Sequence, residues 1–496
     1  MCAQKGEAAA DTAPVAGMQS VQADPALWPR LVGAKSVKVS SDERIARGRA
    51  ARTDTPRSSH RLFPPSEDRR DPVGLLEEQS RTRVQALVPV RYARMLVSPF
   101  SFFRGSALLF SSDLVHTPVS AMTAQLCGDA HLSNFGVFAS PERYLYFDVS
   151  DFDESSPGPW EWDVKRLAAS LEVAGRDNEY SSEQRRTIVR SSVRSYREAM
   201  SEFSAMSMID VWYAHLDIDR LLPRFNSLLN SKTTPGAWHA LAEARVQDSH
   251  RSIDMLTEIV DDGPRIAGDA PVIVPIEELG WDLDSPQLKW LHAMIRSYAP
   301  TLQPELRHLL EQYRLVHVAR KVSGVASVGM DTWIVLLLEH AYSSPVLLQV
   351  KRAESSVLER FGPKGAFSNH GQRVVWGQRL MQATDDIFLG WERDAREGEQ
   401  NDYYIRQLPD WQGSADIAGM TPAAMELWGR MCGWTLARAH ARSGDRIAIA
   451  AYLGKSDSFD RATVKFAKAC ADQNERDYEA LRKAVKKGRV VAESDF

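Results

Sequence analysis

Two neighbouring stretches decide the expected fold: CGDAHLSNFG at residues 127–136 and FDVSDFDE at residues 147–154. The aromatic and β-branched residues before the second acidic run are typical of a strand, so residues 123–153 are expected to form strand, loop and strand. Asp129 precedes Asn134 by five positions in the loop, and Asp151 stands at the end of the second strand. Polar side chains from two adjacent strand ends are therefore expected to meet.

These three side chains are the set that phosphoryl transfer requires. Asp129 would accept the proton of an attacking hydroxyl, while Asn134 and Asp151 would hold Mg²⁺ against nucleotide phosphates. Asp153 is a further candidate metal ligand, and it is equally open as a loop charge. Any of these residues alone is more often a turn residue that satisfies its own backbone, but the combination between two strands favours the chemical interpretation.

A metallophosphoesterase is a rival interpretation, because Gly-Asp-x-His at residues 128–131 also opens the metal site of that class. Such a site needs more Asp, Asn and His ligands downstream. The only Asn-His pair is Asn369-His370, far along the chain, and no Gly-Asp-x-x-Asp segment follows. This interpretation is therefore less favoured than phosphoryl transfer.

A second group of candidates lies in residues 316–351, where three short strands are expected at 316–322, 333–340 and 346–351. A turn with Gly324, Ser327, Val328 and Gly329 joins the first two, and glycine-bearing turns let backbone N–H groups approach phosphate. Lys351 ends the third strand, where a kinase-type site places the lysine that contacts phosphates. Its orienting carboxylate is open, and the carboxylates near it in sequence are Glu354 and Glu359.

The acidic loops resemble those of a known fold. Gly128–Asn134 resembles the catalytic loop of aminoglycoside and choline phosphotransferases, a branch of the protein-kinase-like fold, and Asp151–Asp153 resembles their metal-binding motif. GPWEWDVKRLA at residues 158–168 resembles the segment that follows, in which the resemblance implies that Asp163 begins a helix and braces the catalytic loop. Leu436–His440 resembles the helix that normally precedes that loop.

Most of the chain from about residue 40 onward also resembles a bacterial family of unknown function, the domain-of-unknown-function family twenty-two fifty-two. This family is usually grouped with kinase-like folds. The resemblance is carried by the phrases at residues 98–100, 103–105, 128–136, 158–166, 377–382 and 439–445.

The expected fold class is α+β, a protein-kinase-like two-lobed fold in permuted order, because the glycine turn and Lys351 follow Asp129 in the chain. Residues 1–40 are expected to be a mobile tail, and Arg-rich residues 41–97 a helical arm starting near Ser41. The remaining expected parts are a large lobe at 98–313, a nucleotide lobe at 314–410 and C-terminal helices at 411–496 that complete the large lobe. The resemblance implies that the strand at 404–408 forms the hinge under adenine, with Gln407 and Leu408 as nucleotide contacts.

His131 is expected to orient the catalytic loop, and Arg104 and Arg442 are expected to contact phosphate or brace Asp129 and Asp151. A helix is expected to be capped by Asp71, with Pro72 at its first position, and to continue through 75–87. Further helices are expected at 160–175, 182–205, 236–261, 285–316 and 371–383. The acidic residues near 210–219 are candidates for meeting a cationic acceptor, although a solvated helix face is the simpler interpretation.

Composition narrows the function classes. Lys and Arg number 61 and Asp and Glu 65, so a net charge of −4 gives no sign of nucleic-acid binding. No apolar stretch approaches the roughly 20 residues that span a bilayer, and four scattered cysteines form no metal or disulfide pattern. We therefore expect a cytoplasmic phosphotransferase that uses ATP and Mg²⁺ on a small hydroxyl compound. A regulatory pseudokinase and an AMP transferase are alternatives that use the same residues; acceptor and oligomeric state are left open.

Overall fold

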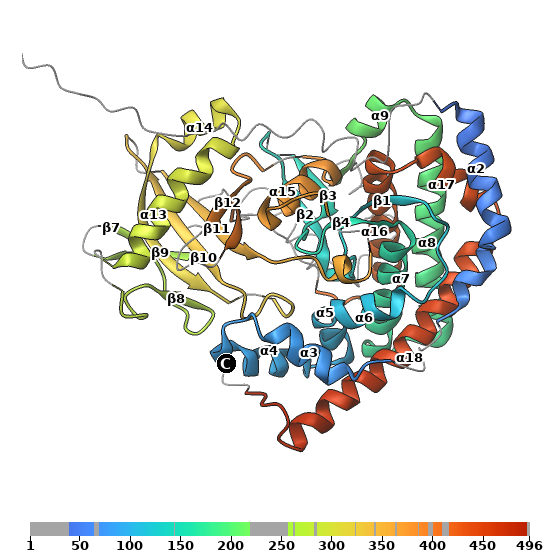
Figure 1. Cartoon of the computed structure of the whole chain (residues 1–496), viewed down its shortest axis with the longest axis horizontal. Helices are drawn as coiled ribbons and strands as arrows, with labels where there is room; N and C mark the ends of the chain where they lie inside the picture. Colours follow the sequence, from blue (N-terminus) through green and yellow to red (C-terminus); the bar gives the residue numbers. More distant parts are fainter. Residues whose placement is uncertain are drawn as a thin grey trace, which may run out of the picture.

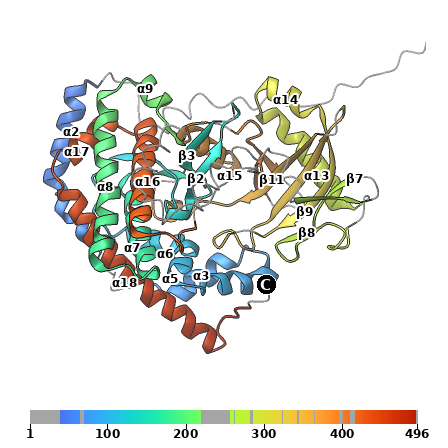
Figure 2. The ribbon, with the colours of Figure 1, turned by 180° about the vertical axis from the view of Figure 1, so that it is seen from behind.

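The computed structural model describes residues 39–63, 69–142, 144–218, 256–260, 263–281, 285–322, 324–341, 344–362, 365–384, 386–394, 400–408 and 416–493. Helices gather on one side of the molecule and a large antiparallel sheet on the other, with helix α15 and two small sheets between them (Figure 1). The view from behind gives the same arrangement (Figure 2). The chain is thus a mixed α+β protein.

Five helices far apart in the sequence form the helical part. They are α7 (Glu161–Asp177), α8 (Ser182–Ala205), α16 (Pro422–Ser443), α17 (Arg446–Leu453) and α18 (Ser458–Lys486). Helices α8 and α16 lie side by side, and Tyr196 Oη is hydrogen-bonded to His440 Nδ1 at 2.9 Å. Their backbones are so close that a Cβ on Gly433 would lie 2.2 Å from the carbonyl oxygen of Ser192. Small residues therefore set the spacing of the two helices.

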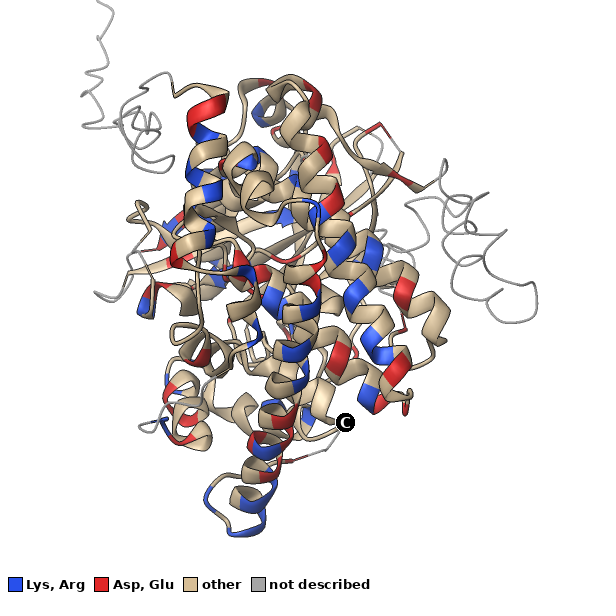
Figure 3. Cartoon of the chain, turned by 90° about the vertical axis from the view of Figure 1, so that its right-hand side faces the viewer, with Lys and Arg blue, Asp and Glu red and all other residues tan. Residues whose placement is uncertain are grey.

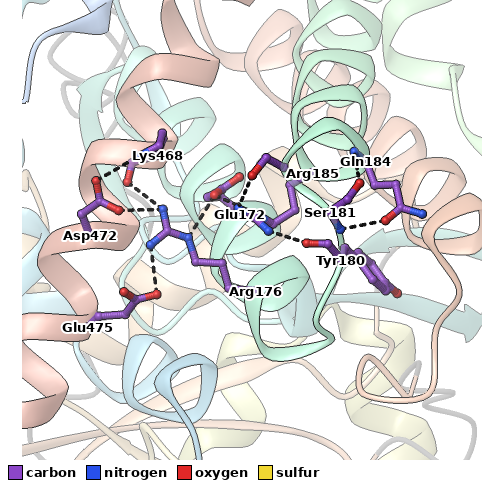
Figure 4. Close-up of polar contacts among 10 residues, drawn as sticks. Glu172, Arg176, Tyr180, Ser181, Gln184, Arg185, Lys468, Asp472 and Glu475 are labelled. Carbon is purple, nitrogen blue, oxygen red and sulfur yellow. Dashed lines mark hydrogen bonds and ion pairs between the residues drawn. The ribbon is translucent and has the colours of Figure 1, made fainter.

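Ion pairs join the outer turns of α7, α8 and α18 (Figure 4). Arg176 of α7 contacts Glu172 at 3.0 Å on its own helix, and Asp472 at 2.8 Å and Glu475 at 2.9 Å on α18. Arg185 of α8 contacts the same Glu172 at 3.0 Å. Basic and acidic residues are interspersed along the helices on this side of the molecule (Figure 3).

The Arg-rich N-terminal segment packs on the helical part. Helix α2 (Ser41–Asp54) begins at the residue expected from the sequence, and a capping box between Ser40 and Glu43 closes its start. Gly48 lies against α17, where a Cβ would meet the carbonyl oxygen of Ala448 at 2.1 Å. The elements that follow are η1 (Arg57–Arg61), α3 (Pro72–Ser80), η2 (Gln85–Leu87), α4 (Val88–Met95), α5 (Pro99–Gly105) and α6 (Ala107–Leu114).

Two small sheets carry the acidic loops. Strand β1 (Thr123–Leu126) pairs with β4 (Ser156–Pro159). Strand β2 (Phe135–Ala139) pairs with β3 (Leu145–Val149), which also pairs with the short β5 (Leu216–Asp217). The two strands expected within residues 123–153 are therefore confirmed as β1 and β3, but the segment between them also contains β2, which was not expected.

The large sheet has six antiparallel strands in the order β12-β13-β11-β10-β9-β8. The strands are β8 (Ile273–Pro275), β9 (Tyr313–Lys321), β10 (Thr332–Glu339), β11 (Pro345–Ala353), β12 (Gly390–Asp394) and β13 (Asn401–Gln407). The three strands predicted between 316 and 351 are confirmed. Helix α15 (His370–Met381) crosses between β11 and β12 in the chain and packs against the sheet.

The two faces of the large sheet have different partners. One face, with Val335 and Val350, packs against α13 (Pro286–Tyr298) in a continuous apolar cluster. The other face carries Ile334, Leu347 and further aliphatic residues, with Ile266 from the hairpin β6 (Thr257–Val260) and β7 (Gly263–Ile266) packed on them. Side chains alternate between faces along a strand, so this pattern also fixes the face to which Lys351 belongs.

Three sequence predictions need correction. The helix expected at 285–316 ends at Tyr298; a short turn (Ala299–Thr301), α14 (Pro304–Leu310) and β9 follow, because Pro300 and Pro304 interrupt the helical hydrogen bonds. The helix expected at 75–87 ends at Ser80. The tail 1–38 and most of the helix expected at 236–261 lie outside the described residues, and residues 257–260 are a strand.

Candidate active site

The loop between β1 and β2 is fixed by its first residues. Gly128 has a φ of +86°, and a Cβ there would lie 2.1 Å from the carbonyl oxygen of Glu154, so only glycine fits. Asp163, in the first turn of α7, accepts the N–H groups of Cys127 at 2.9 Å and Gly128 at 3.1 Å. His440 of α16 lies 3.3 Å from the same carboxylate. Two helices that are far apart in the sequence, α7 and α16, therefore hold the start of this loop.

Asp129 is buried, and its partner is a residue that the sequence did not single out. Arg166, one turn after Asp163 on α7, donates from Nε to Asp129 Oδ1 at 2.7 Å, and His131 Nε2 lies 3.7 Å from Oδ2. Burial raises the pKa of Asp129 to about 6, although Arg166 acts in the opposite direction. The pKa of His131 is lowered by burial and by the arginines near it. Asp129 therefore titrates close to neutral pH, in the range that suits a general base.

Asn134 and Asp151 lie beside Asp129. The side chain of Asn134 donates to the backbone carbonyl of Asp129 at 2.9 Å, and the N–H of Ser150 donates to the carbonyl of Asn134 at 2.9 Å. Burial and then the charge of Asp153 raise the pKa of Asp151, and Asp151 in turn raises the pKa of Asp129. The three residues chosen from the sequence are thus neighbours in space.

Lys351 reaches this group from the large sheet. Its amine donates to Asp153 Oδ2, and the hydroxyl of Tyr404 donates to Asp153 Oδ1 at 2.8 Å. Burial opposes the charge on Lys351, but Asp153, Tyr404 and Asp151 together outweigh it and raise the pKa of the lysine. Lys351 and Asp153 are 198 positions apart in the chain, and the fold brings them into direct contact.

This contact changes two expectations. The partner carboxylate of Lys351 is Asp153 rather than either glutamate, since Glu359 accepts the N–H of Gly365 and Glu354 accepts the hydroxyl of Thr82. Asp153 also has both oxygens engaged by protein donors, which leaves Asn134 and Asp151 as the better candidates for holding a metal. Glutamates next to Lys351 in sequence lie after the strand has ended, whereas Asp153 reaches Lys351 from the turn between β3 and β4.

One known protein family matches most of this chain. The sequence profile described as "Uncharacterized protein conserved in bacteria (DUF2252)" matches residues 83–484. The chain belongs to the DUF2252 family. The match begins after the first helices of the Arg-rich segment, later than the start expected near residue 40. Neither a search of curated proteins nor a search of solved structures returned a match.

The glycine turn of this DUF2252 chain lies at the same end of the sheet as Lys351, because the backbone pairs Thr332 with Lys351. Gly324 and Gly329 have φ of +71° and +82°. Arg94 donates to the carbonyl of Gly324 at 2.8 Å, and the N–H of Val84 to the carbonyl of Gly329 at 2.8 Å. The turn is therefore anchored by the segment 83–94.

The other nucleotide candidates occupy different environments. Val328 is buried in a small apolar cluster with Leu87, and Arg83 donates to its carbonyl. The N–H of Gln407 donates to Asp386 at 2.8 Å, and Leu408 is buried on the aliphatic face of the sheet. Ser327 accepts the N–H of Met330 through its carbonyl at 3.0 Å.

Arg373 of α15 is a second residue that the sequence did not reveal. Its fully buried guanidinium donates to the carbonyls of Ser155 at 2.5 Å, Asp153 at 2.7 Å and Glu354 at 2.8 Å. It therefore fixes the loop that carries Asp153 to the segment that follows the Lys351 strand. The partners are backbone atoms, so no residue pattern signals this contact.

The two other basic candidates differ in their surroundings: Arg104 lies in the site, and Arg442 contacts residues outside it. Arg104 lies near Asp129, and burial is the main cause that lowers its pKa. Arg442 donates to the carbonyl of Gln382 and stacks on Trp212 with its guanidinium 3.8 Å from the ring centre. Arg438, one turn earlier, binds the carboxylate of Asp148 in a pair that is almost completely buried.

Among the described residues, no group of three or more His, Cys, Asp or Glu side chains is arranged to hold a metal ion. Asn369 caps α15 and the N–H of His370 donates to Asp402, so this pair serves the helix end. A site of one carboxylate and one amide, Asp151 and Asn134, suits Mg²⁺, which binds few protein ligands and completes its shell with phosphate and water. Within the described part of the chain, no helix is long and apolar enough to cross a membrane.

Proposed function

We propose that this protein is a phosphotransferase that uses ATP and Mg²⁺ to phosphorylate a small hydroxyl-bearing molecule, with a kinase-like two-lobed fold in permuted order. The observation that carries the proposal is the meeting of Lys351 with the acidic loops: its amine contacts Asp153 and acts electrostatically on Asp151. A cation at the end of a strand and carboxylates in facing loops are the parts that phosphoryl transfer combines.

Each residue has a role in this proposal. Asp129 accepts the proton of the attacking hydroxyl while that oxygen bonds to the terminal phosphorus of ATP, and the bond from that phosphorus to the bridging oxygen breaks to leave ADP. Asn134 and Asp151 hold Mg²⁺, which neutralises charge on the phosphates when bound. Lys351 contacts the phosphates. Asp163 and Arg373 keep the two loops in position through the backbone contacts described above.

The test is turnover by the full chain with Mg-ATP and a panel of small hydroxyl compounds, followed by product analysis. Asp129→Asn should abolish ADP formation while Mg-ATP still binds, and Asp54→Asn, an exposed position on α2, should be unaffected. Full activity of Asp129→Asn would refute the role of Asp129. Release of pyrophosphate instead of ADP would indicate AMP transfer.

A regulatory nucleotide-binding protein is the second candidate, and one observation favours it. Both proposed reactive groups already have protein partners, Asp129 with Arg166 and Lys351 with Asp153. Binding of Mg-ATP without turnover on any acceptor, unchanged in Asp129→Asn, would favour this function over phosphotransfer.

A further inference from the structure

Three basic side chains share one face of the large sheet next to the acidic loops. Lys351 of β11 is paired with Thr332 and Tyr404 in the sheet register, and Arg406 stands two residues beyond Tyr404. Arg320 is paired with Trp333, so the next residue, Lys321, stands across Thr332 from Lys351. Residues opposite each other or two apart point to the same face. Lys321, Lys351 and Arg406 therefore project from the same side.

Two of these cations have side-chain partners among the described residues. Lys351 is bonded to Asp153, and Arg406 donates to Gln349 Oε1 at 2.9 Å and lies 3.4 Å from the carbonyl of Ser150. The Lys321 side chain makes no hydrogen bond and no ion pair with any described residue, although it is only partly exposed. Burial, and then the charge of Arg406, lower the pKa of Lys321.

We propose that Lys321 is a second phosphate-binding residue and that its ligand is the polyphosphate chain of a nucleotide. The inference deepens the proposed function and rests on it. Lys321 is the last residue of β9, directly before the loop that contains Gly324 and Gly329, so it stands where the chain would close over phosphates. An anion between Lys321 and Arg406 would remove their mutual repulsion.

The experiment compares wild type, Lys321→Gln, Lys321→Arg and the control Arg314→Gln by titration calorimetry. Arg314 is an exposed cation at the other end of the same strand. The probes are Mg-ATP, adenosine and inorganic tripolyphosphate. We expect Lys321→Gln to bind Mg-ATP and tripolyphosphate about tenfold more weakly or worse, the effect of losing one charge-assisted hydrogen bond. The affinity of Lys321→Gln for adenosine should stay near the wild-type value. The affinities of Lys321→Arg and Arg314→Gln for all three probes should also stay near wild type.

The outcomes separate this inference from the proposed function. Equal Mg-ATP affinity in wild type and Lys321→Gln would overturn the inference and leave the function standing. Tripolyphosphate binding that needs Lys321, without any binding of Mg-ATP, would support the anion site and count against the function. Equal weakening of adenosine and Mg-ATP in Lys321→Gln would overturn the phosphate role. Failure of wild type to bind any probe would overturn both.

Discussion

Arg166 and Asp163 stand one turn apart on α7, and together they hold the loop of Asp129 by its backbone and by its carboxylate. Asp163 accepts the N–H groups of Cys127 and Gly128, while Arg166 donates to Asp129 Oδ1 at 2.7 Å. The guanidinium of Arg166 also lies 3.8 Å from the ring centre of Phe103, which fills its apolar side. One helix turn therefore sets both the position and the charge of the proposed base.

Arg166→Gln should move the activity profile to higher pH. Arg166 lowers the pKa of Asp129 from the value that burial alone would give, so its loss raises a pKa that stands at about 6. The base must be ionised to act, and the rising limb of kcat against pH should therefore shift upward, with wild-type activity rising near pH 6. A profile with the wild-type midpoint would contradict the electrostatic role. Arg186→Gln, an exposed arginine on α8, is the control.

Glu154→Gln should stabilise the protein at alkaline pH. Burial raises the pKa of Glu154 from 4.5 to about 7. The folded-state pKa lies above the unfolded value, so the contribution of Glu154 to stability is fully present below about pH 4.5 and is lost as pH rises through about 7. Glutamine can still accept the N–H of Val357, which Glu154 accepts at 2.7 Å. Urea unfolding should give a gain of about 2–3 kcal/mol at pH 8 and little gain at pH 4.5.

Arg373→Lys should weaken both the fold and nucleotide binding, despite the retained charge. A lysine cannot direct planar N–H groups at the carbonyls of Ser155, Asp153 and Glu354 together. Loss of such bonds costs roughly 1.5–3 kcal/mol each, so a Tm several degrees lower and weaker binding of Mg-ATP are expected. Arg476→Lys, on the surface side of α18, should change neither measurement; a wild-type Tm for Arg373→Lys would argue against the bridge.

Gly128→Ala should destabilise the protein far more than Gly488→Ala. Both glycines have positive φ, +86° and +71°, so both variants suffer the strain of that conformation, about 1–2 kcal/mol. At Gly128 the new Cβ would also meet the carbonyl of Glu154 at 2.1 Å, whereas nothing lies within 4 Å at Gly488. Thermal unfolding of the pair isolates the steric cost, and similar Tm values would show that the loop yields easily.

Local patterns predicted most helices and the long strands at 313–353, because alternation, caps and prolines act over a few residues. Asp71 caps α3 as its sequence context indicates, whereas the cap of α2 is Ser40 rather than Ser41. The strands β2 and β12 were not predicted. The break after Tyr298 was missed although Pro300 and Pro304 signal it, because the apolar period continues across them. The grouping of Asp129, Asn134 and Asp151 was also accessible, since adjacent strands bring them together.

Contacts between distant segments were harder to predict. For Lys351 the sequence offered only the nearby Glu354 and Glu359 as candidate partners, while its actual partner Asp153 lies in the turn between β3 and β4. The position of Arg166 could have been predicted from the sequence. It follows Asp163 by three positions on one helix, which puts both side chains on the same side. The position of Lys321 could not, since only the register of β9 against β10 shows that it shares a face with Lys351.

The helical part is completed by residues more than 200 positions downstream of α7 and α8, as the contact between Tyr196 and His440 shows. During synthesis on the ribosome, the apolar sides of α7 and α8 emerge long before α16 exists to cover them. Because these contacts join segments far apart in the sequence, they form late and slow folding. Until they form, the apolar surface of the nascent chain is exposed and prone to aggregation. Truncation before α16 would therefore yield an insoluble product. Co-expression with chaperones that bind the exposed apolar sides of α7 and α8 should increase the yield of soluble protein.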